Sequence, residues 1–150
     1  MDIIIKDLKK TFGEKVAVDI PELTIHSGEL LGLVGNNGAG KSTLSRLILD
    51  LIKADTGTVH MKEVNGGLCV NVAETEIWKD WTGAFVDEGF LIDFLTPEEY
   101  FAFIGKITNM TQAQVDERLK DFERQAGGEI FGQKKLIRNL SAGNKQKVGI

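Results

Sequence analysis

The sequence contains a single cysteine and two prolines, and it has no long hydrophobic run. Cys69 alone excludes an internal disulfide and a cysteine-rich metal site, so we expect it to be a small buried hydrophobic residue. No apolar stretch approaches the roughly 18 residues that a membrane-spanning helix needs. Met1 leads directly into Ile3–Ile5 without a basic segment or cleavage site, so no secretory signal is expected. These absences predict a cytoplasmic protein whose membrane contacts are peripheral.

Positive charge is scarcer than negative charge. The chain has 18 Lys and Arg against 22 Asp and Glu, which gives a formal net charge of −4. Because nucleic-acid binding depends on clustered cations, this balance argues against a nucleic-acid partner. With 150 residues, of which 42% are hydrophobic, the chain is long enough for one globular domain with a core.

A glycine-rich stretch at residues 35–43 carries the strongest functional signal. Its sequence GNNGAGKST fits the phosphate-binding pattern G-x-x-x-x-G-K-[ST]. The apolar run Leu30–Val34 before it predicts a strand buried on both faces. The apolar spacing after it predicts an amphipathic helix whose buried face carries Leu44, Leu47, Ile48, Leu51 and Ile52. Strand, loop and helix together are the context that the motif requires.

The chemistry of phosphate binding explains the residue types in this stretch. Glycines let successive backbone N–H groups turn toward an anion at the positive N-terminus of the following helix. A lysine supplies a mobile charge to the β- and γ-phosphates, and the next hydroxyl is a ligand for Mg²⁺. Ser42 is the predicted Mg²⁺ ligand, and Thr43 would hydrogen-bond a phosphate. The predicted nucleotide-binding residues in this stretch are Asn37, Gly38, Ala39, Gly40, Lys41, Ser42 and Thr43.

Short strands are predicted around this loop. Alternating apolar residues predict a first strand that begins at Ile3 and ends near Lys9-Lys10. Two further strand pieces, split by Pro21, are predicted at residues 16–18 and 23–26. A hairpin is expected from residues 58–61 and 68–72, which flank Gly66-Gly67. A short helix within residues 74–81 and a buried strand at residues 82–86, running into Asp87, complete the first half.

The second half has helical signals. Thr96-Pro97-Glu98-Glu99 is a capping box with proline at the first helical position, and Thr111–Gln114 is a second box. The helix after the second box is expected to stop at Gly127-Gly128. These helices predict a helical subdomain over residues 88–140.

A second motif narrows the function. Residues 139–148, NLSAGNKQKV, resemble the L-S-G-G-Q-x-Q signature of ATP-binding cassette (ABC) proteins, and they follow the phosphate loop in the order that this family has. The chain is therefore similar to the nucleotide-binding subunit of an ABC transporter. The segment around Asp87 and the 95–100 stretch resemble bacterial exporter subunits most.

The resemblance implies an α/β fold, the P-loop NTPase fold of the ABC type. It consists of an antiparallel β subdomain, an α/β core and a helical subdomain. We expect residues 1–87 to form the nucleotide-binding core with the β subdomain, 88–140 the helical subdomain, and 141–150 the start of the signature helix. Three catalytic residues of the family are expected after Ile150: the Asp that organises Mg²⁺, the Glu that acts as general base and the His that senses the γ-phosphate. The chain is thus expected to be truncated, to carry no catalytic residue, and to bind nucleotide without turnover.

By the same resemblance, further site residues are expected. Phe12 would stack on adenine, Val18 would lie near the apolar floor of the base site, and Asp87 would ligate Mg²⁺ at the family's Q-loop position. The signature residues would act in trans on ATP bound to an opposite subunit, and they are Ser141, Ala142, Gly143 and Asn144. Asp87, Ala142 and Asn144 depart from the usual family residues. The shorter carboxylate of Asp87 can reach the metal directly or through a bridging water.

The function that the resemblance implies is ATP binding, coupled in the complete protein to hydrolysis and membrane transport, most simply export. The cofactors would be ATP and Mg²⁺. The partners would be a second ABC subunit in a head-to-tail dimer and a transmembrane permease subunit, at the inner face of the cell membrane. Alternatives are a non-catalytic nucleotide-binding fragment and a soluble ABC ATPase of translation or DNA repair. A small-molecule kinase would need an arginine-rich lid, but residues 88–140 contain only Arg118, Arg124 and Arg138.

Overall fold

The computed structural model describes residues 1–64, 66–126 and 128–149. The chain forms two compact units, Met1–Gly83 and Ala84–Ile150, and each is described by itself. The first unit contains the sheet and the glycine-rich loop, and the second contains three α-helices and the signature motif.

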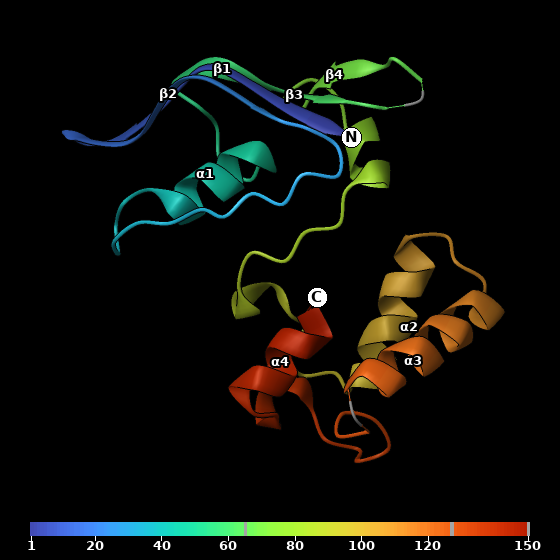
Figure 1. Cartoon of the computed structure of the whole chain (residues 1–150). Helices are drawn as coiled ribbons and strands as arrows, with labels where there is room; N and C mark the ends of the chain where they lie inside the picture. Colours follow the sequence, from blue (N-terminus) through green and yellow to red (C-terminus); the bar gives the residue numbers. More distant parts are fainter. Residues whose placement is uncertain (65, 127, 150) are drawn as a thin grey trace. The chain divides into compact units, whose positions relative to one another are not determined.

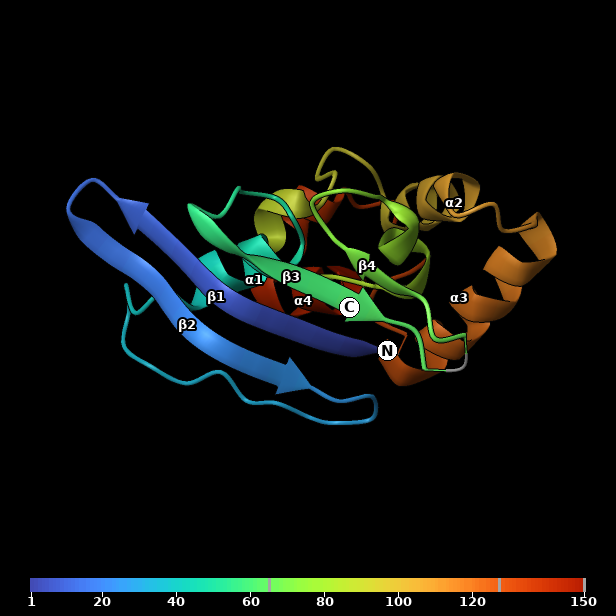
Figure 2. The ribbon, with the colours of Figure 1, turned by 90° about the horizontal axis from the view of Figure 1, so that it is seen from above.

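A four-stranded antiparallel sheet dominates the first unit. Its strands are β1 (Asp2–Phe12), β2 (Lys15–Ile25), β3 (Thr56–Lys62) and β4 (Cys69–Asn71), in the order β2-β1-β3-β4 (Figures 1 and 2). β3 and β4 form the hairpin expected from the sequence, with His60 opposite Asn71. The predicted antiparallel β subdomain is confirmed.

The expected break at Pro21 is wrong, because β2 runs without interruption through the proline. Proline cannot donate a backbone hydrogen bond, but β2 lies at the edge of the sheet and needs a partner on one side only. The neighbouring strand accommodates it, since the regular register skips from Lys6 opposite Glu22 to Leu8 opposite Ile20. Asp7, between these two residues of β1, has a left-handed φ of 47°. The sheet therefore tolerates Pro21, because β2 is an edge strand and its pairing with β1 is irregular at this position.

One face of the sheet is covered by helix α1 (Lys41–Ile48), and the core lies between them. The predicted helix is confirmed but shorter than its apolar pattern, since it ends at Ile48 and leaves Leu51 exposed. A 3₁₀ helix, η1 (Ile77–Trp81), closes the same core, and the indole N–H of Trp78 donates to the Val72 carbonyl at 3.2 Å. The buried core residues are Ile5, Leu8, Val18, Leu44, Leu47, Val59, Met61, Val72 and Trp78.

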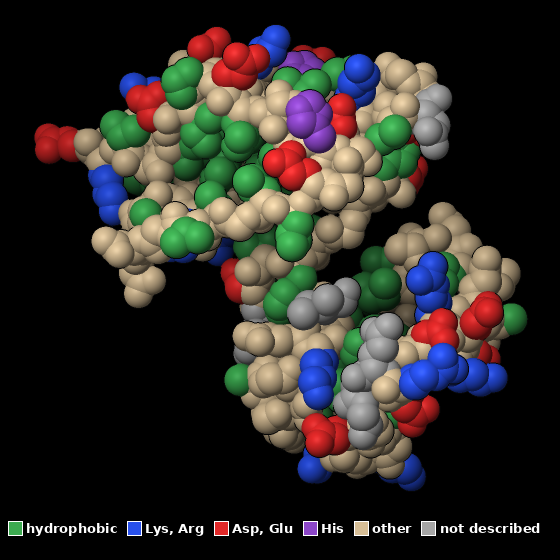
Figure 3. Space-filling view, viewed as in Figure 1, with side chains coloured by type: hydrophobic (Ala, Val, Ile, Leu, Met, Phe, Trp, Pro, Cys, Tyr) green, Lys and Arg blue, Asp and Glu red, His purple; other side chains and the backbone are tan. Residues whose placement is uncertain are grey.

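Two predicted strands are absent from the structure. Leu30–Val34 is a coil, and Thr82–Val86 is also coil. A strand requires hydrogen bonds to a neighbouring strand, and within the described part of the chain neither segment pairs with one. Leu30 is 99% exposed and Val34 94%, so the apolar run that predicted burial lies on the surface of this chain. Figure 3 shows hydrophobic side chains at the surface over α1 and the preceding coil.

Asp55 connects the segment after α1 to the end of β1 through hydrogen bonds. Its carboxylate accepts hydrogen bonds from the Lys10 ammonium at 2.8 Å and from the backbone N–H and hydroxyl of Thr11, each at 2.6 Å. These donors favour the ionised form, led by Lys10, and lower the pKa of Asp55 from 3.8 to about 2. The group is therefore ionised across the physiological pH range.

Asp55→Asn is expected to lower the thermal midpoint at neutral pH. A carboxyl with a depressed pKa in the folded chain stabilises it above the unfolded pKa, near pH 4, and loses that effect as the pH falls toward 2. The difference in midpoint between parent and variant should therefore shrink over this range in thermal unfolding followed by circular dichroism. Asp19→Asn is the control, since it removes an exposed carboxylate that pairs with Lys9 at 3.4 Å. A constant difference from pH 7 to pH 2 would contradict the assignment.

The second unit contains α2 (Pro97–Ile107), α3 (Gln112–Ala126) and α4 (Ala142–Gly149), with short 3₁₀ helices η2 (Glu88–Phe90) and η3 (Ile137–Asn139). The capping box before α2 is confirmed, since the Thr96 hydroxyl accepts from the Glu99 N–H and the Glu99 carboxylate accepts from the Thr96 N–H. The second box is also present between Thr111 and Gln114. The predicted stop at Gly127 lies outside the described residues, and Gly128 has a left-handed φ of 72°.

The core of the second unit joins its 3₁₀ segments, its 128–132 loop and α4. Its buried residues are Leu91, Ile130, Ile137, Leu140 and Val148. Phe101, Phe122 and Phe131 pack against them with ring centroids 5.1 to 5.8 Å apart. The helical subdomain predicted from the sequence is present.

Two further expectations concern the surface. Cys69 is exposed on β4, so the prediction that it is buried is wrong. β4 has three residues and lies at the edge of the sheet, where β3 is its one partner among the described strands. Such a short edge strand leaves its side chains open to solvent. Among the helices of the described residues, none is both long and apolar enough to cross a membrane.

Candidate functional site

The glycine-rich loop lies directly against β2. Gly40 is the N-cap of α1 and has a left-handed φ of 90°. A Cβ atom at this position would collide with the Ala17 carbonyl, so only glycine allows this close approach. Ala17 falls where the pairing of β1 and β2 shifts register, between Lys10 opposite Val18 and Thr11 opposite Val16. The bulge thus provides the backbone surface on which the loop rests.

Lys41 folds back over the loop. Its ammonium donates to the Gly35 carbonyl at 2.6 Å and to the Asn36 carbonyl at 2.9 Å. The loop is closed further by a hydrogen bond from the Ala39 N–H to the Asn36 carbonyl at 3.1 Å. The lysine is therefore held at the loop, where a phosphate would meet both its charge and the N-terminus of α1.

A cavity of about 330 Å³ opens between the loop and the β1–β2 hairpin. It brings together seven of the predicted nucleotide-binding residues, and the hairpin contributes two more. The residues that line it are Phe12, Lys15, Ala17, Asn37, Gly38, Gly40, Lys41, Ser42 and Thr43. Among the described residues that line it, Lys41 and Lys15 are charged and none is acidic, so the cavity is suited to an anion.

Two predicted residues are placed elsewhere. Val18 is buried in the core beneath Gly40 and does not line the cavity, because its neighbour Ala17 takes that place at the bulge. Ala39 also lies outside the lining, and its Cβ is directed toward Gly35.

Lys15 and Ala17 were not predicted from the sequence as site residues. A usable signal was the turn at Gly13-Glu14, because a tight hairpin there places Lys15 directly opposite Phe12. Side chains of directly opposed residues lie on the same face of a sheet, so whatever Phe12 contacts is within reach of Lys15.

The Phe12 ring is half exposed at the mouth of this cavity and is suited to stacking. It is 54% exposed, and the Lys10 ammonium lies 5.6 Å from its centroid. Lys10 is in turn hydrogen-bonded to Asp55. One cation therefore contacts the aromatic ring while much of the ring stays open for a flat apolar group.

The signature motif forms the start of α4 in the second unit. The Ser141 hydroxyl accepts from the Asn144 N–H at 3.3 Å, and its carbonyl accepts from the Lys145 N–H at 2.9 Å. Ser141, Ala142 and Gly143 are exposed, whereas Asn144 is half-buried. The predicted position of the signature at a helix N-terminus is confirmed, with Ser141 as the cap.

Asp87 also belongs to the second unit. Its carboxylate accepts a hydrogen bond from the Gly89 N–H at 2.9 Å. The structure thus describes Asp87 within a local turn before η2, and its role as a magnesium ligand stays a prediction.

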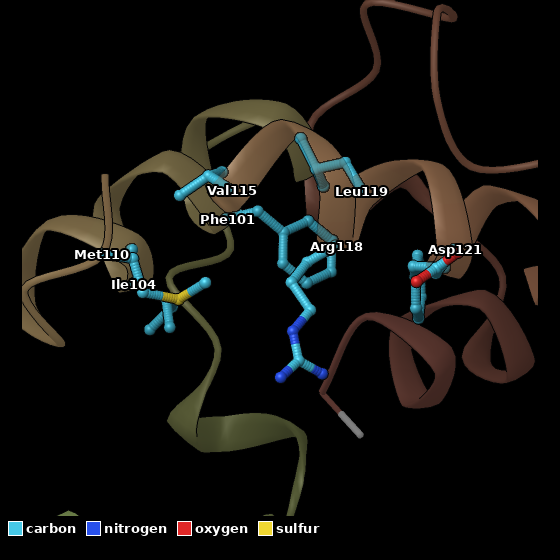
Figure 4. Close-up of a pocket in the computed structure, with 9 residues that line it drawn as sticks. Phe101, Ile104, Met110, Val115, Arg118, Leu119 and Asp121 are labelled. Atoms are coloured by element: carbon cyan, nitrogen blue, oxygen red, sulfur yellow. The ribbon is translucent and has the colours of Figure 1, made fainter. Parts of the chain in front are cut away.

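Another cavity, of about 380 Å³, lies between α2 and α3 (Figure 4). Its walls are mainly apolar and include Phe101, Ile104, Met110, Val115 and Leu119, with Arg118 and Asp121 from α3. Gly105 brings the two helices together, because a Cβ there would collide with Val115. The cavity is thus a packing gap between crossing helices, without the convergent backbone donors of the glycine-rich loop.

Comparison with known sequences agrees with this geometry. The family described as "ABC transporter" matches residues 18–150 of the chain. The methionine import ATP-binding protein MetN of Brucella abortus (strain 2308) is 31% identical over 147 residues, which are 97% of this chain and 39% of that protein. A probable sulfate/thiosulfate import ATP-binding protein CysA of Chlorella vulgaris is 32% identical over 155 residues, covering 100% of this chain and 61% of that protein.

The Nod factor export ATP-binding protein I of Sinorhizobium fredii (strain NBRC 101917 / NGR234) matches a shorter part of the chain. It is 53% identical over 57 residues, which are 38% of this chain and 17% of that protein. The chain thus spans 39% to 61% of the length of the relatives that it matches along nearly all of its own residues.

Solved structures share the fold. The dimeric structure of MJ0796, a bacterial ABC transporter cassette, has a TM-score of 0.78 at 24% identity, and the match covers 99% of this chain and 67% of that one. A post-hydrolysis structure of the same cassette bound to ADP and Pi has a TM-score of 0.75 at 22% identity, covering 98% and 66%. These likenesses confirm the predicted ABC-type P-loop fold. With the family match over residues 18–150, they lead to one conclusion: the chain belongs to the ABC transporter family.

Proposed function

We propose that the chain binds Mg-ATP in the cavity between the β1–β2 hairpin and the glycine-rich loop, as part of the ATP-binding subunit of an ABC transporter. The observation that carries this proposal is the convergence of Phe12, the glycine loop and Lys41 on one cavity. The adenine base stacks on Phe12, and the β- and γ-phosphates lie on the loop, where Lys41 exchanges the carbonyls of Gly35 and Asn36 for phosphate oxygens.

The residues of the first unit are suited to magnesium that arrives with the nucleotide. Within the described residues there is no cluster of three or more His, Cys, Asp or Glu that could hold a metal alone. Mg²⁺ commonly binds through one or two protein oxygens together with substrate phosphates. Ser42, exposed in the first turn of α1 and lining the cavity, would supply such an oxygen, and Asp87 is the proposed second ligand. The ion would neutralise phosphate charge.

The proposed partners follow from the signature motif and the relatives. Ser141 and its neighbours are exposed at a helix N-terminus, which suits them to contact the phosphates of ATP bound to a second ABC subunit. The MJ0796 cassette, whose fold this chain shares, is dimeric, which supports a pair of subunits here, and we propose a head-to-tail arrangement. We further propose a transmembrane permease as partner, with the protein peripheral at the inner membrane face.

We do not propose export, although the sequence analysis expected it. The relatives that match nearly the whole chain are named as import proteins, whereas the export protein matches over 57 residues only. Similarity along the whole length therefore favours import over the exporter likeness of the sequence around Asp87.

Lys41→Ala is expected to weaken ATP binding by about 10–100-fold, the usual effect of losing a charge-assisted hydrogen bond of about 1.5–3 kcal/mol. Isothermal titration calorimetry with Mg-ATP measures the change directly. Lys53→Ala is the matched control, since it removes another lysine close to α1 that does not line the cavity. Equal ATP affinity for parent and Lys41→Ala would remove the loop from the proposed site.

A further inference from the structure

Lys15 connects the hairpin to the middle of the glycine-rich loop. It begins β2, opposite Phe12, and its ammonium donates to the Gly38 carbonyl at 3.1 Å. The two residues are 23 positions apart in the sequence, so this hydrogen bond is a tertiary contact. A lysine whose stem crosses from a sheet to a phosphate-binding loop is placed where an anion would bind.

The contact with Gly38 contributes little to the stability of the fold. Both groups are exposed, and an exposed hydrogen bond mostly replaces one to water. Gly38 has a left-handed φ of 82°, and a Cβ at this position would lie 3.4 Å from the Lys15 ammonium. A neutral carbonyl is a weaker partner for an ammonium than a phosphate oxygen, so the cation gains when an anion enters the cavity.

We propose that Lys15 is a nucleotide-binding residue that holds the phosphate nearest the nucleoside. The inference rests on the proposed binding of ATP in this cavity. The Lys15 ammonium, which donates to the Gly38 carbonyl, transfers on nucleotide binding to an oxygen of the α-phosphate.

The assignment to the α-phosphate follows from where the two lysines are anchored. Lys41 is tied to the carbonyls of Gly35 and Asn36, at the beginning of the loop. Lys15 comes from the hairpin end that carries Phe12 and reaches the loop at Gly38. A base on Phe12 and terminal phosphates at Lys41 place the phosphate adjacent to the nucleoside within reach of Lys15. The cavity thus has one cation for each end of the phosphate chain.

Lys15→Met tests this by removing the charge while keeping an unbranched side chain. Isothermal titration calorimetry of parent and variant with Mg-ATP and Mg-ADP should show about tenfold weaker binding of both nucleotides, because both contain the α-phosphate. Adenosine binding, measured by competition with a fluorescent ATP analogue, should be unchanged. Lys15→Arg should restore most of the ATP affinity. Lys6→Met is the control, an exposed lysine of β1 that lies outside the cavity lining.

The outcomes separate this inference from the proposal beneath it. No ATP binding by the parent chain would overturn the proposed function itself. ATP binding that is equal in parent and Lys15→Met would overturn the role of Lys15 alone. An equal loss for adenosine would show that Lys15 only shapes the hairpin, and this too would overturn the inference. Circular dichroism of each variant confirms that the fold is retained.

Discussion

Changing both Leu30 and Val34 to lysine is expected to turn a self-associating chain into a monomer. The two side chains are 99% and 94% exposed in a coil that pairs with none of the described strands. Burying a Leu or Val side chain gains about 1.5–3 kcal/mol, and two chains that pair these segments bury several such residues. Extended apolar segments with free backbone groups readily recruit another chain. We therefore expect the parent to associate with rising concentration.

Sedimentation velocity over a range of concentrations measures this effect. The matched control changes Leu51 and Val64 to lysine, since these are also exposed and carry the same side chains and the same added charge. The Leu30/Val34 variant should stay monomeric at concentrations where the parent and the control form oligomers. A parent chain that is monodisperse and monomeric at every concentration would contradict the prediction. It would mean that this segment is covered within the chain in solution.

Gly40→Ala is expected to abolish nucleotide binding and to destabilise the first unit. A residue with a Cβ in the left-handed region costs about 1–2 kcal/mol. Here the new Cβ also collides with the Ala17 carbonyl, so the loop has to move away from β2. Moving the loop separates Lys41 and the N-terminus of α1 from the hairpin that carries Phe12. We expect the free energy of ATP binding to weaken by about 3 kcal/mol or more, which corresponds to at least a 100-fold drop in ATP affinity.

Gly28→Ala isolates the collision from the conformational cost. Gly28 has φ +81°, and a Cβ there would meet no atom within 4 Å. The variant should lose stability by about 1 kcal/mol and keep the parental ATP affinity. Calorimetric titration with Mg-ATP and thermal unfolding of both variants give the comparison. Similar ATP affinity in Gly40→Ala and Gly28→Ala would refute the close approach of loop and strand.

Local signals in the sequence predicted the local structure well. The capping box at Thr96, the β3–β4 hairpin and the helix after Lys41 depend on residues a few positions apart, and each is present. Seven of the nine predicted residues of the phosphate and base site line one cavity. Six of them belong to the stretch at residues 35–43 that carries the pattern G-x-x-x-x-G-K-[ST], which contains the geometry of its own loop.

Features that depend on distant partners were not predictable in the same way. The apolar pattern of Leu30–Val34 predicts a buried strand, but such a pattern does not show which strand would pair with it. Pro21 reads as a break until β2 is known to be an edge strand. Lys15 and Ala17 join the site only through strand register and a bulge, neither of which is encoded within a few residues. Each difference depends on which segments pair across the sheet, and local propensity does not determine that.

The exposed thiol on β4 makes the chain well suited to spectroscopic labelling. Cys69 is the sole cysteine and is accessible, so a maleimide fluorophore or a nitroxide attaches at one known position without prior removal of other thiols. β4 pairs with β3, whereas the glycine-rich loop adjoins β2 at the opposite edge of the sheet, so the label stays clear of the nucleotide. One added cysteine on the exposed face of α3 would complete a donor–acceptor pair that follows the separation of the two units as ATP is added.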